Sequence, residues 1–155
     1  MEFRTIKGTH DILPEESFIW RHLENIIHQI CAQYGYQEIR TPIFEQSKLF
    51  SRSVGEESDI VTKEMYSWED KGNIFLTLRP ELTASVVRSF NQHNLRNLSP
   101  IQRFYYIGPL FRRERPQKGR QRQFHQFGIE TFGSNLAEQD AEVIALAWQM
   151  LSHLG

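Results

Sequence analysis

The sequence predicts an α+β fold in which a mainly antiparallel sheet is flanked by helices. Runs rich in aromatic and β-branched residues follow one another across short turns, around residues 65–78 and again around 102–132, which is typical of hairpins. Stretches with apolar residues at helical spacing lie near both ends of the chain. Because strands and helices do not alternate regularly, the order of elements disfavours a doubly wound parallel sheet.

Length and composition restrict the class of protein. The 155 residues, of which 39% are hydrophobic and 24% charged, suit a single globular domain over residues 1–155. A net charge of -1 gives no strong overall attraction to nucleic acid or anionic membranes. The single cysteine, Cys31, excludes an internal disulfide, and no stretch approaches the roughly 20 apolar residues of a transmembrane helix. We therefore expect a cytoplasmic protein with no membrane segment.

The N-terminal part predicts a long helix followed by a short strand. Pro14 suits a first helical turn, apolar residues then recur at helical spacing, and Gly35 can end the helix. A strand over about 36–40 follows, and a proline stops it. Residues 43–63 show no clear pattern apart from a short helix near 47–53.

The central part predicts a hairpin, a helix and then a longer hairpin. Strands over 65–68 and 73–78 are joined by a turn, and a helix follows over about 81–90. Two long strands, 102–114 and 121–132, enclose a loop that contains proline and glycine.

The last segment predicts a second long helix. Asn135 can cap its first turn, and Glu138 stands three residues later, which is the capping-box pattern. We expect its apolar side to consist of Val143, Ile144, Ala147, Trp148 and Leu151.

Basic residues concentrate between the two long strands. Phe111–Glu130 carries Arg112, Arg113, Arg115, Lys118, Arg120 and Arg122 in a chain of near-zero net charge. Guanidinium groups bind phosphate through paired, charge-assisted hydrogen bonds. The pattern therefore indicates a phosphate or RNA contact, with an ordinary solvated basic loop as the open alternative.

Strand alternation sorts the second long strand into two faces. Phe124, Gln126, Gly128 and Glu130 share one face, and the apolar residues between them share the other, which we expect to be core. On the preceding strand, Arg112 and Glu114 share a face by the same rule. If the strands pair, one surface suits a nucleotide plus a small cationic or amino ligand, while a plain solvent-facing sheet stays possible.

A second cluster, Leu78–Thr83, lies at the junction between a strand and a helix. Glu81 and Thr83 can cap this helix and compensate its dipole, and the pattern alone favours that role. The alternative is a carboxylate and a hydroxyl that bind an α-ammonium group. No metal site is expected, because the histidines do not have the spacing of metal ligands.

Several motifs resemble those of histidyl-tRNA synthetases, a class II family, and together they cover essentially the whole chain. Lys7–Asp11 with Leu13–Pro14 resembles the family's N-terminal signature, and Tyr34–Pro42 resembles motif 1. Arg79–Ala84 is similar to the Arg-Pro-Glu-Gly-Thr-Ala box. The remaining segments, which resemble motif 2 in its histidine-specific form, are Phe111–Arg120 and Arg122–Gly128.

The resemblance implies a class II fold that binds ATP with Mg²⁺. Arg112 would hold the α-phosphate, Glu114 would contact the adenine end, and Phe124 would stack on the adenine ring. Arg115 and Arg120 in the loop would lie near the triphosphate or the tRNA acceptor end. The implied activity is formation of histidyl-adenylate and transfer of histidine to tRNA(His), in a homodimer built through motif 1.

The resemblance also implies a histidine site. Glu81, Thr83 and Gln126 would take the α-amino group, and Glu130 would approach the imidazole. Leu82 departs from the family pattern, because a glycine is expected there, and its bulk is expected beside the ammonium site.

The chain lacks motif 3 and an anticodon-binding domain, so we expect a fragment of the catalytic domain with an incomplete sheet. One alternative is the synthetase-like regulatory subunit of ATP phosphoribosyltransferase. The joint retention of five residues argues against it, namely Glu81, Thr83, Arg112, Gln126 and Glu130. A second alternative is a non-catalytic dimerisation or RNA-contact module.

Overall fold

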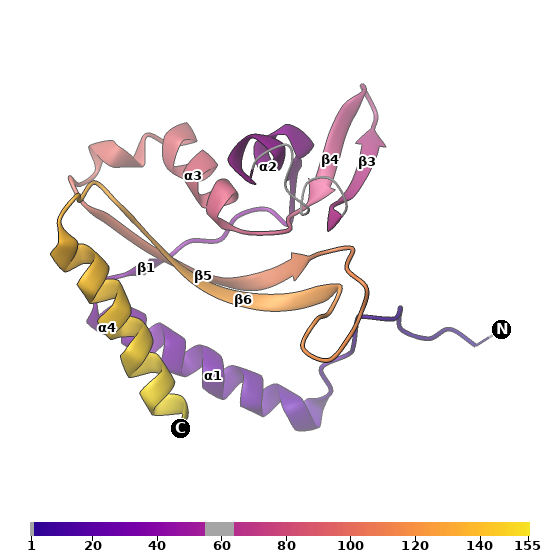
Figure 1. The fold of residues 1–155 in the computed structure, drawn as a ribbon, viewed down its shortest axis with the longest axis horizontal. Helices are drawn as coiled ribbons and strands as arrows, with labels where there is room; N and C mark the ends of the chain where they lie inside the picture. The colour runs from indigo at the N-terminus through magenta and orange to yellow at the C-terminus, as the bar shows by residue number, and fades with distance from the viewer. Residues whose placement is uncertain (1, 55–63) are drawn as a thin grey trace.

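The computed structural model describes residues 2–54 and 64–155 and confirms the α+β fold (Figure 1). The elements, in chain order, are α1 (Pro14–Gln33), β1 (Gln37–Glu38), β2 (Phe44–Gln46), α2 (Ser47–Val54), β3 (Tyr66–Asp70), β4 (Ile74–Leu78), α3 (Thr83–Gln92), the short 3₁₀ helix η2 (Leu95–Asn97), β5 (Gln102–Phe111), β6 (Gln123–Phe132) and α4 (Ala137–Leu154).

The strands form two small sheets. One has the order β1-β5-β6 and the other the order β2-β4-β3. All pairs are antiparallel except β1 with β5, which is parallel. The β5–β6 hairpin is the centre of the molecule, with α1 and α4 on one side and α3, α2 and the β2-β4-β3 sheet on the other (Figure 1). The hairpin therefore has one face toward α1 and α4 and the other toward α3 and the second sheet.

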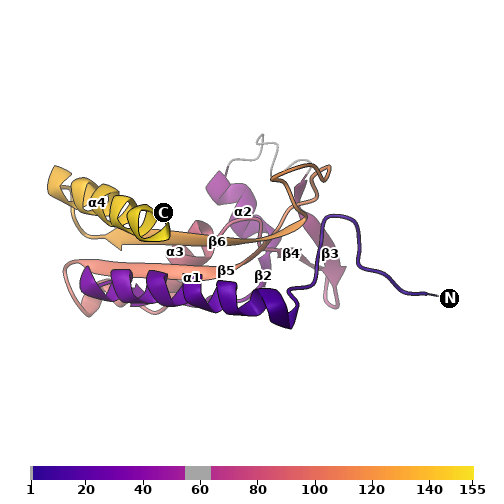
Figure 2. The same ribbon diagram turned by 90° about the horizontal axis from the view of Figure 1, so that it is seen from below.

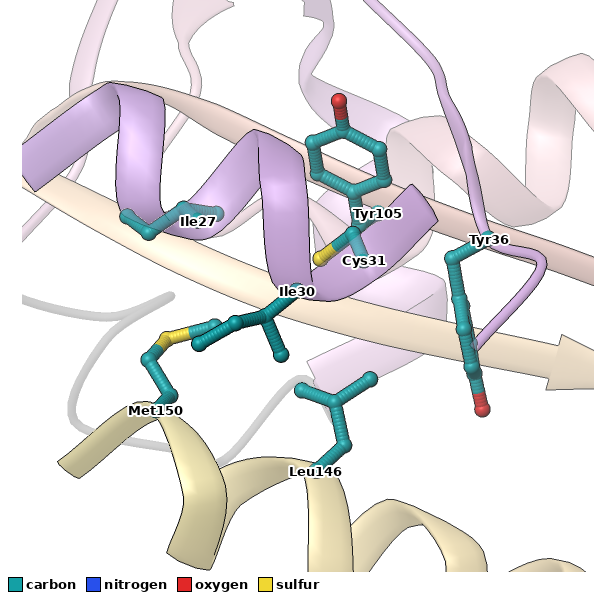
Figure 3. Packing of buried hydrophobic residues seen from close by; sticks show 7 residues of the cluster. All are labelled: Ile27, Ile30, Cys31, Tyr36, Tyr105, Leu146 and Met150. Atoms are coloured by element: carbon teal, nitrogen blue, oxygen red, sulfur yellow. The ribbon is translucent and has the colours of Figure 1, made fainter. Parts of the chain in front are cut away.

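The larger core lies between α1, α4 and the β5–β6 hairpin. Figure 2 shows the two helices side by side along the hairpin, and in Figure 3 Leu146 and Met150 of α4 point toward Ile30 of α1. Cys31 belongs to the same cluster and is fully buried. Burial raises the pKa of its thiol to about 12, so Cys31 behaves as a packing residue rather than a nucleophile.

Several predicted boundaries are confirmed, and others are wrong. The first helix, the short helix after residue 46 and both hairpins are present, but β2 has no counterpart in the prediction. The long strands are shorter than predicted, since β5 ends at Phe111 and β6 begins at Gln123. The last link of the ladder is the bond from the Arg112 N–H to the Arg122 carbonyl, 2.9 Å. Beyond it Pro116, which has no N–H to donate, lies in the connecting loop.

The predicted apolar side of α4 is wrong. Leu146 and Met150 are buried, whereas Ile144 is 69% and Trp148 74% exposed. This helix has apolar residues on more than one side, and periodicity alone cannot select the side that meets the sheet. The capping box is also absent, because the N-cap residue is Leu136, with no side-chain cap.

Within the described residues, no helix combines the length and the apolar composition needed to cross a bilayer.

Candidate functional site

The register of β5 and β6 places the predicted ligand residues on one face. Gly108 is opposite Gln126, Tyr106 is opposite Gly128, and Phe104 is opposite Glu130. Residues directly opposite each other in an antiparallel pair point to the same side of the sheet. The intervening residues Phe127 and Ile129 pack against the α1–α4 core, as the alternation predicted. The other face points toward α3.

The N-terminus of α3 meets this face at a cluster of carboxylates and hydroxyls. Thr83 Oγ1 donates a hydrogen bond of 2.6 Å to Glu130 Oε1, and the Tyr106 hydroxyl lies 3.5 Å from the same oxygen. Burial raises the pKa of Tyr106 to about 12, so its hydroxyl stays protonated and acts as a donor. Two carboxylates, from Glu81 and Glu130, thus lie near hydroxyl groups, and such a site favours a cationic ligand.

Glu81 caps α3. Its carboxylate accepts the Ala84 N–H at 3.0 Å, which is the capping role that the pattern favoured. Burial raises the pKa of Glu81, the backbone N–H groups of Ala84 and Thr83 oppose this effect, and the charge of Glu130 adds to it. Capping and ligand binding are compatible, because a carboxylate has lone pairs for several donors.

Gln126 carries a buried amide oxygen that has no hydrogen-bond partner among the described residues. Leaving a buried acceptor unsatisfied costs about 1–3 kcal/mol. An N–H donor on a ligand would satisfy it. Gln126 therefore points to a donor-bearing ligand on the same face as Glu130.

Arg112 begins the loop after β5 and is held by its neighbours. Its Nε donates to the Pro80 carbonyl at 3.0 Å, and its guanidinium carbon lies 5.2 Å from the centroid of the Phe124 ring. One guanidinium nitrogen is 3.9 Å from Glu114. The predicted strand through Glu114 is wrong, yet the loop still brings Glu114 close to Arg112.

A cavity of about 550 Å³ opens at this end of the hairpin. Its lining residues are Glu64, Arg112, Glu114, Gly119, Arg120, Gln121, Phe124 and His125. Both loop arginines are exposed, but Arg120 lines the cavity and pairs with Glu114 at 3.4 Å, whereas Arg115 does not line it. A larger cavity of about 730 Å³, beside α2, contains none of the predicted ligand residues. Cation, aromatic ring and carboxylate therefore converge on the smaller cavity.

Gly128 has a steric role on this face, and the expectation for Leu82 needs correction. Gly128 makes room for the Tyr106 ring rather than for a ligand, because a Cβ there would lie 2.2 Å from Tyr106 Cζ. Leu82 is only 2% exposed and packs with Phe104 and Leu110, so its bulk lies in the core rather than beside the ammonium site.

Tyr106 and Arg79 are site-building residues that the sequence analysis missed. Tyr106 is identified by its position opposite Gly128. This position is known only once the register of the two strands is known. Arg79 lies directly before Pro80, whose carbonyl holds Arg112. In residues 2–54 and 64–155, no group of three or more His, Cys, Asp or Glu side chains is placed to hold a metal ion.

Glu81→Gln is expected to raise the thermal midpoint by about 2 °C at pH 7.5. A carboxyl whose pKa is raised on folding contributes stability that is present below its unfolded pKa and lost as pH rises through its folded pKa. Glutamine has no carboxylate to ionise, so stability is not lost as pH rises. Its amide oxygen can still accept the Ala84 N–H. The gain should shrink toward pH 4.5 in calorimetric scans at both pH values.

The matched control is Glu138→Gln, on the exposed first turn of α4. It should show no such pH-dependent gain. If Glu81→Gln lowered the midpoint equally at both pH values, loss of the cap would dominate and the role of burial would be contradicted.

The fold and this face define the class of protein as the class II aminoacyl-tRNA synthetase core. A solved structure of apo S. aureus histidyl-tRNA synthetase matches with a TM-score of 0.82 and 40% identity, over 99% of this chain and 35% of that chain. The family model described as histidyl-tRNA synthetase matches residues 8–155. The chain therefore belongs to the histidyl-tRNA synthetase family.

The relatives are longer than this chain. It is 54% identical over 155 residues to the histidine–tRNA ligase of Halothermothrix orenii, covering all of this chain and 37% of that protein. A structure described as an ATP phosphoribosyltransferase regulatory subunit/histidyl-tRNA synthetase from Bacillus halodurans also has a TM-score of 0.82, at 28% identity over 98% of this chain and 38% of that one. The higher identity to the ligases does not favour the regulatory-subunit alternative.

Proposed function

We propose that this chain supplies the ATP- and histidine-binding face of a histidine–tRNA ligase. The observation that carries the proposal is the convergence on one face of the Arg112–Phe124 pair and the Glu81–Thr83–Glu130 cluster. One half suits a nucleotide and the other half suits an amino acid with a cationic group.

Histidine would lie over the carboxylate cluster. Its α-ammonium group would donate to Glu81 and to the buried side-chain oxygen of Gln126. The imidazole N–H would donate to Glu130, whose orientation is fixed by Thr83. These contacts would leave the carboxylate of histidine directed toward Arg112.

ATP would bind with its adenine on Phe124 and its α-phosphate on Arg112, in the cavity at the end of the hairpin. A histidine carboxylate oxygen attacks the α-phosphorus, the bond to the bridging oxygen breaks, and pyrophosphate leaves with that electron pair. Negative charge accumulates on the phosphate oxygens in the transition state. The Pro80 carbonyl holds the Arg112 guanidinium in place, so little reorganisation is needed to stabilise that charge.

The other partners follow from the same proposal. Mg²⁺ would enter with ATP as part of the substrate, and tRNA(His) would accept histidine beside Arg115 and Arg120. Two copies would associate through Tyr34–Pro42, which contains β1, one of the two edge strands of its sheet. The single, buried cysteine agrees with action in the cytoplasm.

The test is histidine-dependent exchange between ATP and pyrophosphate, together with calorimetric binding of ATP. Arg112→Ala is expected to lower exchange by about 100-fold, because one preorganised cation on the reacting phosphate is lost. Arg113→Ala is the matched control, since its side chain is exposed and its backbone N–H bond to Glu64 is retained.

Exchange that requires histidine and falls only in Arg112→Ala would support the proposal. If neither ATP nor histidine bound, or if both arginine variants behaved alike, the assignment of this face would be contradicted.

A further inference from the structure

The segment before α1 contacts the base of the loop that joins β5 to β6. The Gly8 carbonyl accepts hydrogen bonds from the Arg122 N–H at 2.7 Å and from the Gln123 N–H at 3.2 Å. The backbone N–H and the hydroxyl of Thr9 donate to the Ile6 carbonyl at 2.9 and 2.8 Å. This turn presents the Gly8 carbonyl to the start of β6.

Position 8 has no space for a side chain. Gly8 has a φ of +90°, and a Cβ there would lie 2.9 Å from Cγ of Pro116 and 2.9 Å from Cγ of Arg122. Pro116 belongs to the outgoing part of the loop and Arg122 to the returning part. Position 8 therefore lies close to both arms, with no room for a side chain between them.

The residues that contact Gly8 are also bonded to, or adjacent to, the proposed ATP-binding residues. The carbonyl of Arg122 accepts the Arg112 N–H at 2.9 Å. The Nε of Arg122 donates to the Glu114 carbonyl at 3.3 Å. Gln123 precedes Phe124 in the chain. A shift of the two amides that bind Gly8 would therefore move Arg112 and Phe124 together.

We infer that Lys7–Thr9 is a clamp that positions the ATP-binding loop, with Gly8 as its positioning residue. Gly8 would act through Arg112 and Phe124 rather than by touching the ligand. The identity of the nucleotide rests on the proposed function, whereas the clamp rests on the contacts of Gly8 with Pro116, Arg122 and Gln123.

The experiment is hydrogen–deuterium exchange of the full chain, followed at residues 112–123, in Gly8→Ala and Gly72→Ala. Gly72 has a φ of +91°, but no atom of the described residues lies within 4 Å of an added Cβ, so this control carries the same backbone strain without the clash. We expect the Arg122 and Gln123 amides to exchange about 10-fold faster or more in Gly8→Ala only. Amides of α1 and α4 should be unchanged in both variants. Unchanged loop protection, or an equal increase in Gly72→Ala, would overturn the clamp.

Thr9→Val keeps the test decisive if Gly8→Ala does not fold. It removes the hydroxyl bond to Ile6 and adds no clash at position 8. We expect a smaller rise at the same amides, and no rise would overturn the inference.

Calorimetry separates positioning of the loop from a general loss of structure. ATP affinity should fall about 10-fold in Gly8→Ala while histidine affinity is retained, because the proposed histidine-binding residues lie on β6 and at or just before the start of α3. Equal loss of both affinities would contradict a positioning role. If the unaltered chain bound no ATP, the proposed function would fail, and the exchange data would still decide the clamp.

Discussion

Replacing Arg79 with methionine is expected to destabilise the fold by about 4 kcal/mol. Arg79 is 4% exposed. It donates from Nε to the Pro109 carbonyl at 2.9 Å and from one terminal nitrogen to the carbonyls of Thr41 and Pro42 at 2.8 and 3.3 Å. Methionine has similar bulk but no donor, so these carbonyls would lose their partner. Chemical denaturation monitored by circular dichroism measures the loss.

Arg103→Met is the matched control for Arg79. Arg103 pairs with Glu142 at 2.9 Å, but its side chain is 31% exposed. An ion pair accessible to solvent contributes about 0–1 kcal/mol. Equal losses in the two variants would contradict the role assigned to Arg79. Lysine should not restore stability at position 79, because a single ammonium cannot reproduce the planar fork of a guanidinium.

Gly128→Ala is expected to lower histidine affinity at least 10-fold and to destabilise the fold by about 2 kcal/mol. The added Cβ would overlap the Tyr106 ring, and Tyr106 is 5% exposed and packed in the cluster with Leu82 and Phe104. The ring would have to shift within this packed cluster to relieve the overlap, so its hydroxyl would leave Glu130 and the packing around it would be strained. Calorimetric titration with histidine and thermal scans measure the two effects.

A double variant tests whether the clash causes both effects. Tyr106→Leu removes the ring atoms that an alanine at 128 would meet. The cost of Gly128→Ala should therefore be much smaller in this background than in the unaltered chain. If the two changes were simply additive in the free energy of unfolding, steric conflict between positions 106 and 128 would be ruled out.

The features that depend on local pattern could be predicted from the sequence. The helix from Pro14 is confirmed because its start signal and apolar spacing lie within one segment. The assignment of Phe127 and Ile129 to the core is confirmed because a strand alternates faces whatever it pairs with. The same rule placed Gln126 and Glu130 together.

The features that depend on contacts between distant segments could not be predicted from the sequence. The choice of Leu146 over Trp148 for the buried side of α4 is made by the sheet and by α1. The fit of Tyr106 over Gly128 requires the register of two strands. In the sequence, nothing distinguishes Arg79 from the other basic residues. Its role depends on the fold, which places the Thr41 and Pro109 carbonyls within hydrogen-bond distance of its guanidinium.

The ten-residue pairing of β5 with β6 also limits how the length of the chain can change over evolution. Deleting a single residue from the first half of β6 would turn the following side chains over, sending Glu130 toward α1 and Ile129 toward α3. Residues 113–121 lie outside this ladder, and an isolated bridge joins two of them, Gln117 and Arg120. Insertions and deletions between homologues should therefore collect at the tip of this loop, while the two strands keep a constant length.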